Sequence, residues 1–503
     1  MRIVLSTLNA RYTHASFGLR YLQANLGPHE ASSVIKEYTI KRPAGEIAAD
    51  LLSLEPELVG FGVYIWNTDQ TLAVVRELRA RKPGLLIVLG GPEISHETES
   101  QPLYELVDHV FKGEADFLFR DFVADWIERG VRPDKKVLGP KLPEIKEIAM
   151  PYRLYSDEDI KHRTLYVEAS RGCPYKCEYC LSSLDVSVRN FKADEFLHEM
   201  DQLIQRGARQ FKFVDRTFNL SPTVSCQILQ FFLDRIDLGL FLHFEMVPDR
   251  LPEELKELIK KFPAGSLQFE IGVQTWSPLV ARNVSRRQNY EKIQENFKFL
   301  KAETGVHTHA DLIVGLPGET FESFAAGFDA LASLKPDEIQ VGILKRLKGT
   351  PIVRHDQTFA MKYDVVPPFQ ILENKDLSPE QLGRLEVFAD FWDLVANSGR
   401  YNQVMSLFEG QKSLFDSVYK LSQDLHRTFG RTHSIHLREL DAELPKAVSG
   451  VLGCGEAVVM EALRVDQERR QKAGSGHESA QVQAVPERQR SHLAGASGQT
   501  NIH

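Results

Sequence analysis

Short apolar runs alternate with amphipathic stretches over the first 150 residues of the chain. Residues 68–81 and 117–129 carry apolar side chains at helical spacing. The runs between such stretches are short enough to be strands, and they lie at residues 3–5, 34–35, 58–63, 85–89 and 109–111. This alternation predicts an α/β fold in which helices cover both faces of a parallel sheet. We therefore expect residues 1–150 to form a doubly wound domain that binds ligands beyond the carboxyl ends of its strands.

The alternation restarts near residue 164. Further strand-like runs, joined by helical stretches, occupy residues 165–168, 211–214, 240–244, 267–274, 309–316 and 339–344. Consecutive β/α units of this kind predict a partial (β/α)6 barrel of TIM type within residues 151–365, with its functional groups at the carboxyl ends of the strands. Asp215, Glu245 and Gln274 each close one of these runs. Each is a candidate to contact a polar cofactor, and the alternative for each is a helix cap or a loop residue.

Helical spacing dominates the region after the predicted barrel. Residues 378–381, Ser-Pro-Glu-Gln, have the form of a capping box with proline at the first helical position. They open an amphipathic helix that we expect to run to about Ala396, with its apolar stripe in the core. A small helical domain is predicted for residues 366–465, packed against the open side of the barrel. Residues 466–503 are rich in polar residues and poor in large apolar ones, so we expect a disordered tail.

Composition and charge argue against several classes of protein. The 503 residues carry a net charge of −8, which is not the basic footprint typical of nucleic-acid binding. We find no apolar run long enough to span a membrane and no signal peptide at the N-terminus. With only five cysteines, three of them in one short segment, a disulfide framework is not expected. We therefore expect a cytoplasmic protein that has neither a membrane nor a nucleic acid as its partner.

Cys173, Cys177 and Cys180 form a C-x3-C-x2-C motif within residues 171–180. Three thiolates on one loop can hold three irons of a [4Fe–4S] cluster, which leaves the fourth iron free to bind another ligand. A structural zinc site is an alternative and would need a fourth ligand such as His162, Cys226 or Cys454. Zinc sites usually have a second C-x2-C pair, and the chain has none. Buried cysteines without a metal are the remaining interpretation.

The cysteine motif, with an aromatic residue before its last cysteine, resembles the cluster loop of radical S-adenosylmethionine (SAM) enzymes. The resemblance implies that the free iron chelates the amino and carboxylate groups of SAM. An electron from the cluster then splits SAM into methionine and a 5′-deoxyadenosyl radical. The resemblance extends over the predicted barrel, although the usual Gly-Gly-Glu is replaced by Asp-Arg-Thr-Phe at residues 215–218. It implies SAM contacts at Tyr179, Asp215, Glu245, Gln274, Ile313 and Gly315.

The first domain resembles the cobalamin-binding domain that precedes many radical SAM cores. The resemblance rests on a first-strand loop at residues 9–18, a Gly-Gly turn at residues 90–91 and an Asp-x-x-x-x-Gly-Glu segment at residues 108–114. It implies cobalamin contacts at Asn9, His14, Gly90, Gly91 and Glu114. The Asp-x-His-x-x-Gly motif of cobalamin mutases is absent, so we expect no histidine of the protein on cobalt. A domain that keeps the fold and has lost the ligand is the alternative.

Together these features resemble a cobalamin-binding (class B-like) radical SAM protein with an uncharacterised helical C-terminal domain. The resemblance implies an enzyme that cleaves SAM reductively and methylates an unactivated carbon of a small molecule, with an external electron donor such as flavodoxin or ferredoxin. A cobalamin-independent radical SAM oxidoreductase is one alternative. An RNA-modifying methylthiotransferase-like enzyme is another, although the first 172 residues lack the cysteines of its second cluster. A non-catalytic sensor of cobalamin or of a cluster is a third, and Glu245 and Gln274 argue against it.

Overall fold

The computed structural model describes residues 3–475, and the chain folds as two compact units. Of the described residues, the first unit contains 3–244 together with the short segments 346–351 and 365–369. The second unit contains 245–345, 352–364 and 370–475. The short segments show that the chain returns to the first unit after it has entered the second.

A six-stranded parallel sheet forms the centre of the first domain, with strand order β2-β1-β3-β4-β5-β6. Its strands are β1 Ile3–Asn9, β2 Ser33–Thr39, β3 Leu58–Gly62, β4 Leu86–Gly90, β5 His109–Phe111 and β6 Val137–Leu138. The order places β1 between β2 and β3, so the chain winds outward in both directions from β1. This confirms the doubly wound sheet predicted from the alternating pattern.

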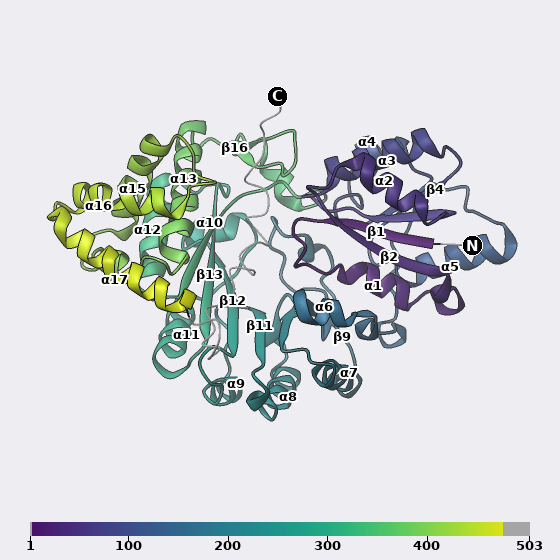
Figure 1. The fold of residues 1–503 in the computed structure, drawn as a ribbon, viewed down its shortest axis with the longest axis horizontal. Helices are drawn as coiled ribbons and strands as arrows, with labels where there is room; N and C mark the ends of the chain where they lie inside the picture. The colour runs from purple at the N-terminus through teal and green to yellow at the C-terminus, as the bar shows by residue number, and fades with distance from the viewer. Residues whose placement is uncertain (1–2, 476–503) are drawn as a thin grey trace. The chain divides into compact units, whose positions relative to one another are not determined.

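Helices cover both faces of this sheet (Figure 1). They are α1 Phe17–Ala24, α2 Ala44–Ser53, α3 Thr68–Arg81, α4 Pro102–Glu105 and α5 Asp116–Arg129. In β1 the side chains of Val4 and Leu8 pack in the core beneath α2 and α3, whereas Ile3 and Leu5 pack in the core beneath α1 and α5. Because successive strand residues point to opposite faces, a strand buried on both sides is apolar over most of its length. The two buried hydroxyls of β1, on Ser6 and Thr7, donate hydrogen bonds to the carbonyls of Lys36 and Gly62 (2.9 Å each).

A second six-stranded sheet follows, with order β7-β10-β11-β12-β13-β14. Its strands are β7 Leu165–Val167, β10 Gln210–Phe213, β11 Phe241–Met246, β12 Leu267–Gln274, β13 His307–Val314 and β14 Glu338–Ile343. The helices between them include α7 Ala193–Gln205, α8 Pro222–Leu233, α9 Glu253–Ile259, α10 Pro278–Asn283, α11 Tyr290–Glu303 and α12 Phe321–Ala332. The strand order follows the chain order, as the predicted β/α barrel topology requires.

The open edge of β14 is covered within the second unit by the start of the helical region. Helix α13 Pro379–Trp392 begins at the predicted capping box, in which Ser378 and Gln381 exchange hydrogen bonds of 3.2 and 3.0 Å. A π-helical turn, η9 Asp393–Asn397, continues it. There the Asn397 amide accepts from the backbone N–H of Ile339 (3.1 Å) and donates to its carbonyl (2.9 Å). The amide therefore pairs with β14 as a neighbouring strand would.

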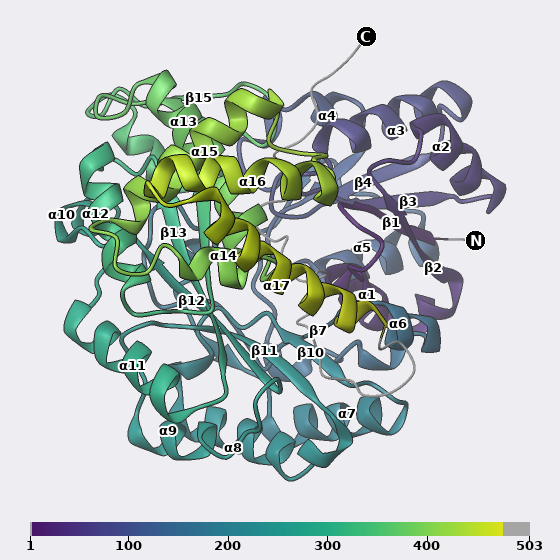
Figure 2. The same ribbon diagram turned by 60° about the vertical axis from the view of Figure 1, so that its left-hand side comes forward.

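The remaining helices complete the predicted helical region. They are α14 Asn402–Ser406, α15 Leu414–Phe429, α16 Leu437–Leu452 and α17 Glu456–Ser475, and α15, α16 and α17 lie side by side (Figure 2). The tail expected from residue 466 differs from the structure, because residues 466–475 belong to α17. The fully buried Asp466 fixes this part of the helix by accepting hydrogen bonds from the backbone N–H groups of Gln403 and Val404 at the start of α14. Residues 476–503 lie outside the described part of the chain.

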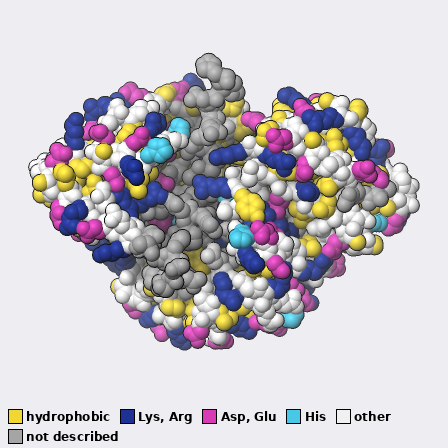
Figure 3. All heavy atoms as spheres, viewed as in Figure 1, with side chains coloured by type: hydrophobic (Ala, Val, Ile, Leu, Met, Phe, Trp, Pro, Cys, Tyr) yellow, Lys and Arg dark blue, Asp and Glu magenta, His cyan; other side chains and the backbone are white. Residues whose placement is uncertain are grey.

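The surface of the folded chain carries charged side chains of both signs. On the face drawn in Figure 3, Lys and Arg side chains are interspersed with Asp and Glu side chains. Among residues 3–475, no helix has both the length and the apolar character needed to cross a lipid bilayer.

The buried carboxylate of Asp466 provides a test of the helical region. We expect Asp466→Ala to lower the free energy of unfolding by about 1–3 kcal/mol, because two N–H groups at the start of α14 would lose their acceptor. Urea denaturation followed by circular dichroism would measure this. Glu468→Ala on the same helix is the matched control, since within residues 3–475 Glu468 pairs with Arg464 alone, at a half-exposed position. Equal stability of the two variants would contradict the capping role.

Candidate functional site

A short two-stranded ribbon closes the cysteine loop at its base. Strands β8 Ser170–Arg171 and β9 Arg189–Asn190 pair antiparallel on either side of the loop. Gly172 has φ +91°, and a Cβ there would lie 2.0 Å from the carbonyl oxygen of Ser187, so only glycine fits. The backbone N–H of Cys173 donates to the carbonyl of Asp185 at 2.9 Å. The first cysteine is thus fixed against the returning strand.

The three cysteines of the loop are largely shielded from solvent. Cys173 and Cys177 are buried and Cys180 is half-buried, and none is in a disulfide. Burial raises the pKa of the Cys173 thiol, and the charges of Cys180 and Cys177 raise it further. Between residues 3 and 475, no three His, Cys, Asp or Glu side chains are grouped so that they could hold one metal ion. Each thiolate ligand of a [4Fe–4S] cluster binds a different iron, so a donor set of three separate thiols suits a cluster.

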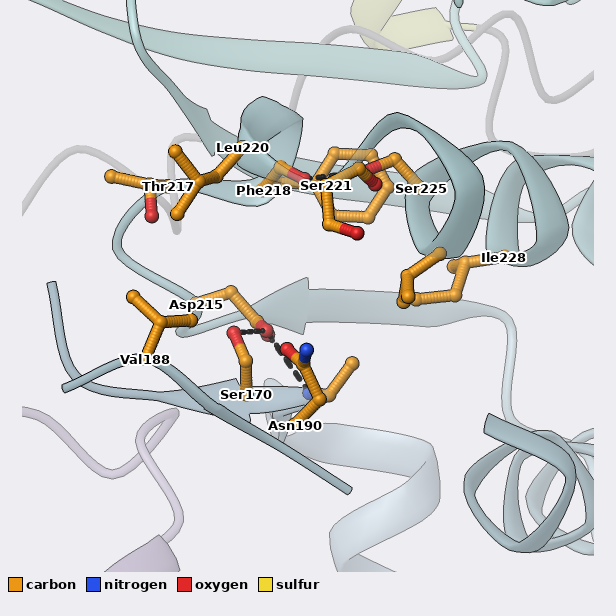
Figure 4. A pocket seen from close by; sticks show the side chains of 12 residues that line it. Ser170, Val188, Asn190, Asp215, Thr217, Phe218, Leu220, Ser221, Ser225 and Ile228 are labelled. Carbon is orange, nitrogen blue, oxygen red and sulfur yellow. Dashed lines mark hydrogen bonds between the residues drawn. The ribbon is translucent and has the colours of Figure 1, made fainter. Parts of the chain in front are cut away.

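Asp215 joins the end of β10 to the segment that enters the cysteine loop. Its carboxylate accepts hydrogen bonds from the backbone N–H of Ala169 (3.0 Å) and from the hydroxyl of Ser170 (2.6 Å) (Figure 4). Burial raises the pKa of Asp215 to about 7. The side chain lines a small pocket whose other walls include Val188, Asn190, Thr217, Phe218 and Ile228. Asp215 therefore fixes residues 169 and 170, which lead into the cysteine loop, through hydrogen bonds.

Among the predicted SAM contacts of the second unit, Gln274 has the most unusual geometry. It closes β12 with φ +70°, and the N–H of Thr275 donates to the carbonyl of Val273 at 2.9 Å, which makes Gln274 the central residue of a γ-turn. The side chain folds over Gly272, where a Cβ would lie 2.5 Å from the amide nitrogen. Its Oε1 atom is buried without a hydrogen-bond partner among the described residues. An unused acceptor of this kind fits a ligand hydroxyl such as those of a ribose.

The other predicted SAM contacts are placed as follows. Glu245 is half-buried within β11, and Tyr179 is half-buried between the last two cysteines of the loop. Ile313 is half-buried in β13 opposite Gly342. Gly315 has φ +92°, and a Cβ there would lie 2.8 Å from the Ile371 side chain in β16 Ile371–Glu373. The close packing of Ile371 therefore favours glycine at position 315.

Two predicted cobalamin contacts in the first-strand loop are engaged by the protein itself. The Asn9 amide donates to the carbonyl of His14 (2.8 Å) and to the carboxylate of Glu37 (3.0 Å). The Nδ1 atom of His14 lies 2.6 Å from the hydroxyl of Tyr166. Burial, followed by the charge of Lys212, lowers the pKa of His14 to about 4. His14 is therefore neutral at pH 7 and held against β7.

The glycine pair after β4 lies close to the backbone of the neighbouring strand end. Gly91 has φ +108°, and a Cβ there would lie 2.5 Å from the carbonyl oxygen of Val63. Glycine at this position allows the turn to pack on the backbone of Val63 after β3. At Gly90 a Cβ would meet nothing closer than the carbonyl oxygen of Phe111, at 3.7 Å.

Glu114 also faces protein rather than solvent. Its carboxylate pairs with the guanidinium groups of Arg171 (2.8 Å) and Arg189, the two basic residues of the β8–β9 ribbon. Arg171 pairs in addition with Asp116 (3.0 Å) and Glu168 (2.9 Å). We call these five residues the arginine clamp. Within the first unit, Glu114 thus connects the β5–α5 loop to the base of the cysteine loop.

Three residues that sequence reasoning missed have unused polar atoms near the first sheet. The Thr13 and Ser16 hydroxyls and the Trp66 Nε1 atom are buried without hydrogen-bond partners in the described chain. They belong to the loops at residues 9–18 and 64–68, which follow β1 and β3. Trp66 stacks on Tyr64 with ring centroids 4.5 Å apart. The two aromatic residues, separated by one position, were the signal available in the sequence. Buried polar groups without partners fit a large polar ligand over these strand ends.

The chain is similar in sequence to several known proteins. Residues 167–331 match the family model of the Radical SAM superfamily. The cobalamin-dependent radical SAM methyltransferase TokK of Streptomyces tokunonensis is 24% identical over 348 residues, which cover 62% of this chain and 50% of TokK. The uncharacterized methyltransferase PH0819 of Pyrococcus horikoshii is 23% identical over 411 residues, or 74% of this chain and 86% of that protein. The chain therefore spans about half the length of the first of these relatives.

A solved structure shares the fold. The radical SAM methyltransferase TsrM of Kitasatospora setae, determined with cobalamin and a [4Fe–4S] cluster bound, superposes with a TM-score of 0.62 at 16% identity. The match covers 85% of this chain and 99% of that chain. The match to the Radical SAM superfamily thus covers residues 167–331, and the similarity to radical SAM methyltransferases extends to sequence relatives and to the fold.

The arginine clamp leads to a prediction about the loop. We expect Glu114→Gln to lower the free energy of unfolding by about 1–3 kcal/mol, because two largely buried arginines would lose a shared carboxylate. Amide hydrogen exchange of residues 172–188 should become faster in the same variant. Asp121→Asn on α5 is the control, since Asp121 is exposed and pairs with its neighbour Arg120. Unchanged exchange in Glu114→Gln would show that the clamp does not hold the loop.

Proposed function

We propose that this protein is a cobalamin-binding radical SAM methyltransferase that modifies an unactivated carbon of a small molecule. The observation that carries the proposal is the ribbon-closed C-x3-C-x2-C loop within the radical SAM domain, preceded by a doubly wound domain with unused polar atoms at its strand ends. When bound, the cluster and SAM would supply a 5′-deoxyadenosyl radical that removes a hydrogen atom, and cobalamin would supply a transferable methyl group.

Cys173, Cys177 and Cys180 are the residues proposed to hold the cluster. The fixed backbone at Gly172 and Cys173 orients the first thiol, and the burial of two of the three thiols keeps water from the site. Asp215 and the arginine clamp hold the two ends of the loop. The contribution of these residues is to keep the loop in place before and after the cluster is bound.

Residues at the strand ends of the barrel and in the cysteine loop are proposed to contact SAM. Gln274 has the strongest support, because its buried amide oxygen has no partner in the described chain. Tyr179, Glu245, Ile313 and Gly315 are proposed from their resemblance to family positions. Asp215 is proposed as a neighbour of SAM that acts chiefly by holding Ala169 and Ser170.

For cobalamin, the proposed site is the loop region after β1 and β3 in residues 1–150. The unused groups of Thr13, Ser16 and Trp66 support it, whereas Asn9, His14, Gly91 and Glu114 would act by shaping the loops. Residues 151–365 would carry the cluster and SAM, and the helices of residues 366–465 would shape the substrate site. A cytoplasmic location and an electron donor such as flavodoxin or ferredoxin complete the proposal.

The cysteine loop provides the direct test of the radical chemistry. Replacing any one of Cys173, Cys177 or Cys180 by Ala should abolish both the cluster, about four irons per chain in the wild type, and the release of 5′-deoxyadenosine from SAM. Cys226→Ala and Cys454→Ala are matched controls and should keep both. Iron and sulfide analysis of anaerobic protein measures the first property, and chromatography of the nucleoside measures the second. One zinc per chain without iron or sulfide would refute the cluster.

The environment of His14 leads to a prediction for cobalamin. We expect hydroxocobalamin to bind, and its absorption spectrum to be the same in the wild type and in His14→Ala, because His14 is held by Tyr166 and does not ligate cobalt. The control is His162→Ala, at an exposed histidine of α6 Asp157–His162. A spectral change confined to His14→Ala would identify a cobalt ligand. No binding by wild type would leave a cobalamin-independent radical SAM enzyme.

A further inference from the structure

The turn that carries Gln274 is strained. A γ-turn with positive φ is rare, and a side chain such as that of glutamine has no intrinsic preference for this conformation. Strained residues of this kind persist only where surrounding contacts fix them, and they occur often at binding sites. The conformation at Gln274 therefore requires an explanation in the residues that surround the turn.

Thr275, the next residue, is held through both its carbonyl and its hydroxyl. Its carbonyl accepts a hydrogen bond from the Gln288 amide at 2.9 Å. Its hydroxyl accepts from the N–H of Ser277 (3.2 Å) and donates to Oε1 of Glu319 (2.7 Å). Glu319 is 1% exposed and lies in the loop between β13 and α12, so it supports the turn from the adjacent β/α unit.

Among the described residues, the hydrogen-bond partner of the buried Glu319 carboxyl group is Thr275. Burial raises the pKa of Glu319 to about 8, and the Thr275 hydroxyl opposes this shift. Burial raises the pKa of Tyr290 on α11, and the charge of Glu319 adds to this, whereas a hydrogen bond with Gln288 and the charges of Arg286 and Arg282 oppose it. Among the described residues no cation is paired with Glu319, and its second oxygen, Oε2, is buried without a partner. At neutral pH the carboxyl group is therefore protonated.

We propose that Glu319 is a positioning residue for the SAM site, which holds the Gln274 turn through Thr275 and so presents the unused amide oxygen of Gln274 to SAM. The inference rests on the proposed function, because Gln274 is its predicted SAM contact. Glu319 itself need not touch the ligand.

Protonation gives this role a distinct pH dependence. The raised pKa means that the folded protein favours the neutral acid, whereas in an unfolded chain the same carboxyl group has its ordinary pKa of 4.5. Stability from the neutral acid is therefore complete below pH 4.5 and is lost as the pH rises to about 8. Above that pH a buried carboxylate without a cation would disturb the turn, so SAM affinity should fall.

The experiment measures SAM binding to the reconstituted holoprotein by equilibrium dialysis between pH 6.5 and 9. We expect wild-type affinity to fall above pH 8 by up to about tenfold per pH unit, the limit for a single proton. Glu319→Gln keeps an uncharged acceptor for Thr275, so it should bind as the wild type does at pH 7 and show a flat profile. Glu319→Ala should bind about tenfold more weakly at every pH, because Thr275 loses its acceptor. Glu322→Gln, at an exposed position in the first turn of α12, is the control and should follow wild type.

A second variant keeps the test decisive if Glu319→Ala does not fold. Thr275→Val removes the donated hydrogen bond with little change in shape and should weaken SAM binding to the same extent. The double variant Thr275→Val/Glu319→Gln should bind SAM as Thr275→Val alone does, because both substitutions affect the same hydrogen bond. Affinity that is independent of pH in wild type and unchanged in Thr275→Val would overturn the positioning role and leave the proposed function intact. Failure of the wild-type holoprotein to bind SAM would overturn both.

Discussion

A buried guanidinium group holds the base of the cysteine loop. Arg171 directly precedes Gly172, and its donors are used by Glu168, Glu114 and Asp116, while its guanidinium lies 4.4 Å over the ring of Tyr21. A charge removed from water is tolerated only where opposite charges satisfy it. Because two of these carboxylates come from the β5–α5 loop and α5, the start of the cysteine loop takes its position from the packing of the first sheet.

Pairing of polar side chains with neighbouring protein groups also occurs elsewhere in the proposed sites. Residues with chemically suggestive side chains, such as His14, Asp215 and Glu114, have their polar atoms engaged by neighbouring protein groups. Apart from Gln274 and Glu319, several atoms left without a partner among the described residues belong to less conspicuous side chains, such as Ser16 and Trp66. A polar atom that is buried and unused is a stronger indication of a ligand than the reactivity of its residue type, because leaving it unpaired is costly.

The sequence predicted what depends on local pattern. Alternation of apolar runs gave the two sheets, the residues at 378–381 gave the start of α13, and cysteine spacing indicated the loop. Interactions between distant residues were not predictable in this way. The pairing of Glu114 with Arg171 and the capping of α14 by Asp466 depend on contacts between segments that no spacing relates. Gly91 shows the limit for single residues, since its close approach to the backbone of Val63 cannot be read from the sequence.

The pairing of Asn397 with Ile339 also bears on how copies of this protein could associate. An exposed edge strand offers unpaired backbone groups on which a strand of another molecule can add. Here both backbone groups of Ile339 are already bonded to one side-chain amide, and the indole N–H of Trp392 donates to the same carbonyl at 2.8 Å. A foreign strand would have to displace Asn397 before it could pair at Ile339. The π-helical turn that carries Asn397 therefore hinders edge-to-edge pairing of β14 with a strand of another molecule.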